Sequence, residues 1–161
     1  MRTEYFDFYD TQGNILSAVI WQPEEVKAVI QVTHGMTEHM GRYEAFAAHM
    51  VRQGVAVAGF DLRGHGRNAG DPDVASLGDF GWKATLSDMQ MFREHLRQLF
   101  PKAKHFMLGF SLGSFLLRDY LNANPMDDLA GAVIMGTGHQ PGWLLAVINR
   151  SPTPNRSNAA P

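Results

Sequence analysis

The sequence predicts an α/β fold with a mostly parallel sheet and helices on both faces. The first observation is that apolar, β-branched runs alternate with amphipathic stretches along most of the 161 residues. The second is that Gly or Pro ends most of these runs, which marks element boundaries. Strands that alternate with helices are joined by crossover connections, and such connections produce parallel pairing.

The N-terminal elements begin with a hairpin. YFDFYD and ILSAVIWQ flank TQGN, whose Gly13-Asn14 pair suits a tight antiparallel turn. AVIQVTHG, residues 28–35, is an apolar run that predicts a central strand. RYEAFAAHMVRQG, residues 42–54, spaces its apolar side chains for a helix that stops at Gly54, and VAVAGFD, residues 55–61, predicts another buried strand.

The second half continues the alternation after a glycine-rich loop, LRGHGRNAGDPD. Residues 84–101 place five apolar side chains on one face and predict a long amphipathic helix that closes before Pro101. Residues 105–110 predict a strand, residues 112–124 a helix, and residues 129–138 a further strand. We therefore expect one core domain over residues 1–150, followed by a disordered or aberrant tail at 151–161 that is rich in proline and lacks apolar periodicity.

Composition excludes several classes of function. Acidic residues outnumber basic ones by 16 to 14, so the composition does not predict the basic surface that binding of nucleic acid requires. The chain contains no cysteine, so disulfides, thiolate metal sites and a cysteine nucleophile are excluded. No stretch reaches the roughly 20 apolar residues of a membrane span, and the N-terminus does not resemble a signal peptide. We expect a cytoplasmic protein without a transmembrane segment, a metal or another cofactor.

One serine stands at a predicted junction between a strand and a helix. Gly109-Phe110-Ser111-Leu112-Gly113 follows the strand at 105–110 and opens the helix at 112–124. In the G-x-S-x-G turn, glycines remove side chains where strand and helix nearly touch, so that the serine can adopt a strained backbone and project its hydroxyl. An ordinary serine N-cap is the alternative interpretation.

Two further motifs lie at predicted strand ends. HGMTEHMGRY, residues 34–43, begins with His34 and Gly35, and Gly35 would let the chain turn sharply and leave the Met36 N–H free. DLRGHG, residues 61–66, ends the next strand. His34 and His65 are interpreted as hydrogen-bonding supports of the backbone, and Glu38 and Arg42 as a local ion pair.

The three motifs together resemble the monoacylglycerol lipase and lysophospholipase branch of the α/β-hydrolases, which is serine aminopeptidase-like. That branch shows H-G-x-x-E-H-x-x-R-Y, D-x-R-G-H-G-x-S-x-G and G-x-S-x-G in this order. The first pattern is complete here, and the third is complete at Gly109, Ser111 and Gly113. The second departs once, because Asn68 replaces the branch's serine. The resemblance covers roughly residues 10–142 and implies that the chain forms the N-terminal part of that fold.

The resemblance also implies a chemistry. Ser111 would be the nucleophile, the backbone N–H groups of Met36 and Leu112 would form the oxyanion hole, and the substrate would be a small lipid ester. Apolar side chains near these positions are candidates for an acyl pocket, although core packing is the commoner role of such residues: Met36, Met40, Phe110, Leu112 and the segment GWLLAVI.

The catalytic acid and base are the missing parts of this prediction. In this fold the acid and the histidine follow the serine along the chain. After Ser111 the only acids are Asp119, Asp127 and Asp128, none expected to reach the site, and His139 is the sole histidine and a weak candidate for the base. We therefore interpret the chain as C-terminally truncated. Either a longer form or a partner completes an ester hydrolase, or the chain is a non-catalytic remnant or binding module. In both cases we expect the isolated chain to self-associate through an exposed sheet edge.

Overall fold

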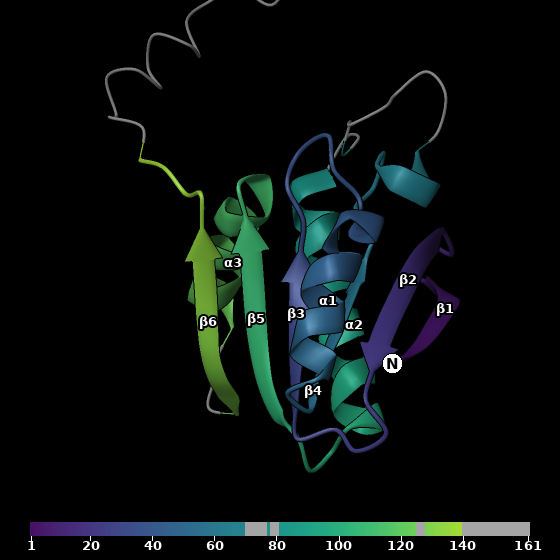
Figure 1. The fold of residues 1–161 in the computed structure, drawn as a ribbon. Coiled ribbons are helices and arrows are strands. Elements are labelled where there is room, and N and C mark those ends of the chain that lie inside the picture. The colour runs from purple at the N-terminus through teal and green to yellow at the C-terminus, as the bar shows by residue number, and fades with distance from the viewer. Residues whose placement is uncertain (70–76, 78–80, 125–127, 140–161) are drawn as a thin grey trace, which may run out of the picture.

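The computed structural model describes residues 1–69, 77, 81–124 and 128–139. These residues form a six-stranded sheet in the order β1-β2-β4-β3-β5-β6 (Figure 1). The strands are β1 (Arg2–Tyr9), β2 (Ile15–Gln22), β3 (Ala28–Thr33), β4 (Val55–Phe60), β5 (Lys104–Phe110) and β6 (Leu129–Met135). The predicted tail at 151–161 and the segment GWLLAVI lie outside the described residues.

The pairing confirms the predicted mixture of parallel and antiparallel strands. β1 pairs with β2 and β2 with β4 antiparallel, whereas β3 pairs with β4 and β5, and β5 with β6, all parallel. The hairpin turn at Gly13 has φ +83°, and the Asp10 carboxylate accepts the Gln12 and Asn14 N–H groups at 2.8 Å. In a tight turn some backbone N–H groups have no carbonyl acceptor, and a carboxylate at this position accepts hydrogen bonds from them instead.

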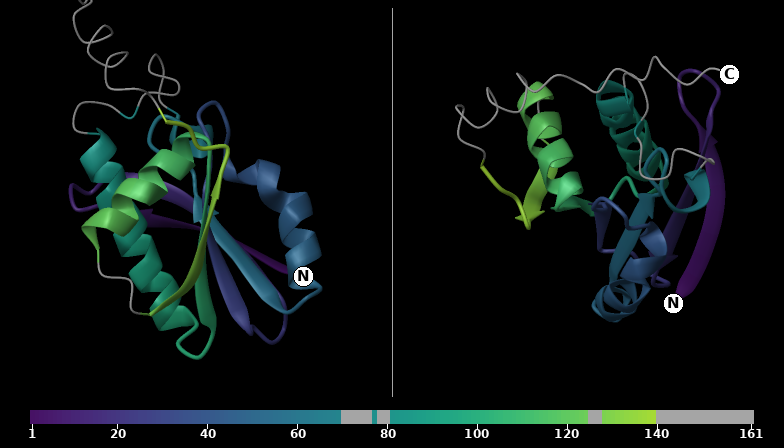
Figure 2. Two further views of the ribbon diagram at one scale, coloured as in Figure 1. Left: turned by 90° about the vertical axis from the view of Figure 1, so that its left-hand side faces the viewer. Right: turned by 90° about the horizontal axis from the view of Figure 1, so that it is seen from above.

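Helices cover both faces of the sheet, as predicted. α1 (Glu44–Val51) packs on one face, and α2 (Gly81–Leu99) and α3 (Leu112–Ala123) pack on the other (Figure 2). Two short 3₁₀ turns, η1 (Met40–Tyr43) and η2 (Gly66–Asn68), precede α1 and follow β4. The predicted helix at 42–54 is therefore shorter than expected, because its first turn is η1 and it ends before Gly54.

Each face has its own hydrophobic core. Phe60, Phe92 and Leu117 belong to the larger core beneath α2 and α3. Trp21, Val57 and Met40 belong to the core beneath α1. The parallel strands in the middle of the sheet are apolar on both faces because each face is covered, which is why they appear in the sequence as continuous apolar runs.

Candidate active site

Ser111 occupies a strained turn between β5 and α3. Its φ is +50° and its ψ −114°, a region that residues with a side chain rarely adopt. Ser111 stands at the N-cap position of α3, yet its side chain makes no capping hydrogen bond. The alternative of an ordinary serine N-cap is therefore not what the structure shows. Ser114 supports the turn instead, since its hydroxyl donates to the Ser111 carbonyl at 2.6 Å.

Glycine at position 113 allows the turn to press against the end of β3. A Cβ built on Gly113 would lie 2.0 Å from the Thr33 carbonyl oxygen and 2.7 Å from that of His34. A Cβ on Gly109 would similarly lie 2.4 Å from the Gly113 carbonyl oxygen. Strand end, turn and helix start are thus in direct backbone contact, as the G-x-S-x-G pattern requires.

The loop after β3 reaches the same place. A Cβ on Gly35 would lie 3.3 Å from the Ser111 Cβ. The Gly35 N–H donates to the Glu38 carboxylate at 2.9 Å, and Glu38 also pairs with Arg42 at 3.6 Å, which confirms the predicted ion pair. Met36, which follows Gly35, is 55% exposed. The convergence of the Met36 and Leu112 N–H groups on one oxyanion position remains a prediction.

His34 supports the backbone of this region. Its Nδ1 lies 2.7 Å from the Gly35 carbonyl oxygen, and its Nε2 accepts the Leu62 N–H at 2.9 Å. Burial lowers the pKa of the imidazole, which favours the neutral ring that this arrangement needs. Both ring nitrogens are already engaged, so His34 is poorly suited to take a proton from Ser111. His65 is also buried and has its Nδ1 2.7 Å from the Arg63 carbonyl oxygen.

Asp61 holds the two motif loops together, a role that the sequence did not reveal. Its carboxylate accepts the Met40 N–H at 2.7 Å and the Arg67 N–H at 2.8 Å. Asn68, where the sequence departs from the branch, donates to the Asp61 carbonyl and accepts the Ser17 N–H at 2.9 Å. The amide side chain thus fastens this loop to β2. The signal available in the sequence was the position of Asp61 directly after a buried strand.

A second network lies beneath these loops. Arg63 pairs with Asp10 and, at 2.8 Å, with Asp88, and both carboxylates are buried. Burial raises the pKa of Asp10, but hydrogen bonds from Asn14, Arg63 and Gln12 outweigh it and hold the pKa at about 2. The network joins the hairpin turn, the loop after β4 and α2. No local spacing in the sequence could predict it, because its three members lie far apart along the chain.

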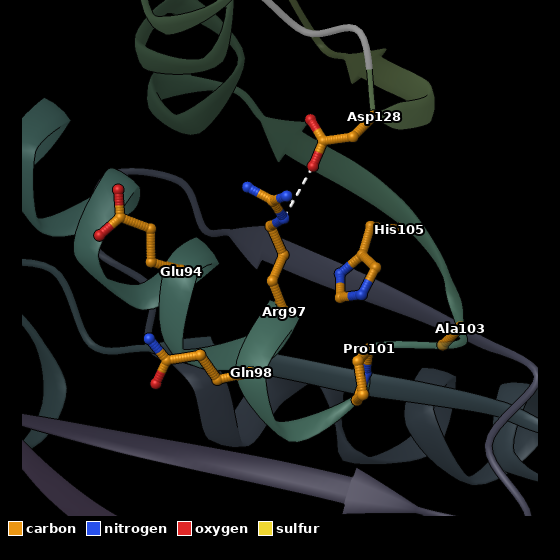
Figure 3. Close-up of a pocket in the computed structure, with 7 residues that line it drawn as sticks. All are labelled: Glu94, Arg97, Gln98, Pro101, Ala103, His105 and Asp128. Atoms are coloured by element: carbon orange, nitrogen blue, oxygen red, sulfur yellow. Dashed lines mark ion pairs between the residues drawn. The ribbon is translucent and has the colours of Figure 1, made fainter.

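The acids after Ser111 point to other partners. Asp119 accepts the Trp82 indole N–H at 2.7 Å on the outer side of α2 and α3. Asp128 pairs with Arg93 and, at 2.8 Å, with Arg97; Figure 3 shows the pair with Arg97. Asp128 precedes β6, which is parallel to β5, so it lies at the opposite end of these strands from Ser111. A cavity of about 630 Å³ lies there, lined mainly by charged and polar side chains. Asp127 lies outside the described residues.

The candidate acyl-pocket residues do not share one cavity. Phe110 lines a largely apolar cavity of about 370 Å³ on the α1 face, together with Phe46 and Met135. Leu112 lines another of about 640 Å³ on the opposite face, with Trp82 and Phe115. His139 is exposed at the rim of this second cavity. Met40 is buried in the core, so only part of the predicted set borders open space beside Ser111.

The fold and the serine turn define the class of the chain, which is that of the α/β-hydrolases. The chain superimposes on a thermostable carboxyl esterase from Bacillus coagulans, in complex with glycerol, with a TM-score of 0.78 and 29% identity over 92% of this chain and 50% of that one. The profile of the family described as serine aminopeptidase, S33, matches residues 24–157, and the chain belongs to this family.

Sequence relatives point to the same family. Monoglyceride lipase from Rattus norvegicus is 32% identical over 65% of this chain and 33% of its own length. Monoacylglycerol lipase from Mycolicibacterium smegmatis is 29% identical over 63% of this chain and 35% of its own. The chain thus corresponds to about a third of the length of these curated relatives. Among its described residues no helix is long and apolar enough to cross a membrane, and no group of His, Asp or Glu side chains is arranged to hold a metal ion.

Proposed function

We propose that residues 1–150 are part of a serine hydrolase core that cleaves carboxylic esters of lipids, of the monoacylglycerol or lysophospholipid type, through an acyl-enzyme on Ser111. The observation that carries the proposal is the strained Ser111 backbone between β5 and α3, with its side chain free of a capping bond. Names of relatives add support, because monoglyceride lipases and a carboxyl esterase are among them.

The proposed reaction begins with attack of the Ser111 oxygen on the ester carbonyl carbon. A base accepts the hydroxyl proton, and the carbonyl oxygen becomes an oxyanion that the Met36 and Leu112 N–H groups would stabilise. Collapse of this intermediate expels the alcohol, which takes up the proton, and leaves the acyl group on Ser111. Water then attacks the acyl-enzyme, releases the fatty acid and restores the serine. His139 is the first candidate base that this chain offers.

A fluorophosphonate probe tests the proposed nucleophile, since only an activated serine reacts with it at an appreciable rate. We expect labelling that maps to Ser111 by peptide mass spectrometry and disappears in Ser111→Ala. Ser87→Ala is the matched control, because Ser87 is exposed and lies on α2, outside the serine turn. Labelling that persists in Ser111→Ala, or that is absent from the folded wild-type chain, would contradict the proposal.

The second candidate function is a binding module that keeps half of a catalytic site. It is favoured by the positions of Asp119 and Asp128, whose carboxylates are engaged with Trp82 and with two arginines away from Ser111. Without an acid and a base, catalysis should be limited to about 10³- to 10⁴-fold over water, which an oxyanion hole and binding alone provide.

Under this second function, the isolated 161-residue chain should hydrolyse a short-chain p-nitrophenyl ester only at near-background rates. The measurement is steady-state release of p-nitrophenol, with Ser111→Ala as the reference for the background. Turnover at ordinary enzyme rates that Ser111→Ala abolishes would show that a base is present in this chain. His139→Ala would then be the next variant to measure.

A further inference from the structure

The end of β6 contacts the strained serine directly. In the parallel ladder of β5 and β6, Phe110 is opposite Met135, and the ladder continues by one more hydrogen bond, from the Ser111 N–H to the Met135 carbonyl at 2.9 Å. The residue with the unusual φ of +50° is therefore held through its own amide. Strained backbone conformations persist only where the surroundings fix them, and this hydrogen bond is one of the constraints that do so.

The chain turns sharply just after this contact. Gly136 has φ +64°, and a Cβ at this position would lie 3.1 Å from the Phe110 ring and 3.5 Å from the Ser111 nitrogen. A glycine is therefore needed both for the backbone conformation and for the close approach of the ring. The turn sends residues 137 and 138 back towards α3.

Arg118 holds these returning residues. Its Nη1 donates to the Thr137 hydroxyl at 3.2 Å and to the Gly138 carbonyl at 3.0 Å. Arg118 lies on α3, the same helix that Ser111 begins. The segment from Met135 to Gly138 is thus attached to α3 at two points, at Ser111 through a backbone hydrogen bond and two turns later through the guanidinium.

We infer that Arg118 is a positioning residue for Ser111, an inference that rests on the nucleophilic role proposed above. Arg118 fixes residues 137 and 138, these fix the end of β6, and the Met135 carbonyl in turn fixes the Ser111 amide. When the guanidinium is removed, the strand end frays, and Ser111 loses a constraint that holds its positive φ. Arg118 is exposed, so its replacement leaves both hydrophobic cores intact.

The direct test is hydrogen exchange of the Ser111 amide, followed by NMR in the folded chain. We expect Arg118→Met to speed this exchange about fivefold to tenfold, because a hydrogen bond from a charged donor is lost at each of two acceptors. Arg118→Lys should restore protection, since one ammonium nitrogen can also donate to both oxygens. Thr137→Val, which removes only one acceptor, should fall between Arg118→Met and wild type.

A reference amide separates positioning from general loss of stability. Leu108 lies in β5, where it pairs with Val32 and Val133, and its exchange should stay unchanged in all three variants. Unchanged exchange of Ser111 in Arg118→Met, an equal increase at Leu108, or failure of Arg118→Lys to restore protection would each overturn the inference.

The same variants distinguish this inference from the proposed function. If wild-type Ser111 reacts with the fluorophosphonate, Arg118→Lys should be labelled as fast as wild type. Thr137→Val should be labelled more slowly, and Arg118→Met most slowly. Where wild-type Ser111 does not react, the nucleophilic role fails, while the exchange rates still decide whether Arg118 holds the turn.

Discussion

Replacement of Gly113 by alanine is expected to destabilise the chain by about 3 kcal/mol or more, at the upper end of what overpacking costs. The new Cβ would lie 2.0 Å from the Thr33 carbonyl oxygen and 2.6 Å from the Thr33 carbonyl carbon. Both atoms belong to the backbone of β3, which pairs with β4 on one side and β5 on the other. Neither can move aside without disturbing the centre of the sheet.

Urea denaturation followed by tryptophan fluorescence measures this effect, since Trp21 is fully buried in the core beneath α1. Gly138→Ala is the matched control, because its Cβ would meet Phe115 at an ordinary 3.6 Å. The control should change the free energy of unfolding by no more than about 0.5 kcal/mol. A loss below about 1 kcal/mol for Gly113→Ala would show that strand and helix are not packed as closely as described.

Self-association through β6 is the second large expected effect. Among the described strands β6 is an edge, and its Val133, Ile134 and Met135 side chains are 50%, 41% and 46% exposed. The strand LAGAVIM carries no charge and no proline, the features that usually prevent edge pairing. An apolar edge with unpaired backbone groups favours pairing with a second copy of the chain.

Light scattering at increasing concentration should therefore give a mass that rises to at least twice the 17.9 kDa of one chain. Ile134→Lys should restore the monomer, because a charge on the edge is costly to bury in a paired sheet. Ile15→Lys is the matched control, since Ile15 is also exposed, at 54% against 41% for Ile134, but lies on β2. A monodisperse wild-type monomer at high concentration, or equal effects of the two lysines, would contradict the prediction.

The spacing of apolar residues predicted the helices and strands, because an element that buries one face or both faces needs apolar side chains on those faces. The observed boundaries of some elements differ from the predicted ones, because residues outside the apolar pattern determine where these elements begin and end. α2 begins at Gly81, before the apolar periodicity starts, and β6 ends at Met135, because Gly136 adopts φ +64° and turns the chain away. The sequence alone does not show whether a glycine has a positive φ. The predicted strand therefore extended past Gly136 to residue 138.

The candidate site was predictable where it depends on a local turn and not where it depends on distant partners. The G-x-S-x-G turn has steric requirements within five residues, and the structure shows the strained serine that this pattern predicts. The buried network of Asp10, Arg63 and Asp88 has no such local signature. The sequence shows three charged residues of types that normally lie at the surface, and only the fold reveals that they share one buried place.

The strand order has a consequence for synthesis of the chain on the ribosome. Ala28 of β3 pairs with Val55 of β4 and also with Lys104 of β5. One edge of the central strand thus has no partner until residues 104–110 have been translated and have left the exit tunnel. During that interval the nascent chain presents an apolar β-edge, a kind of surface that chaperones protect. The Ser111 turn directly follows β5, so the segment that closes this edge also delivers the candidate nucleophile.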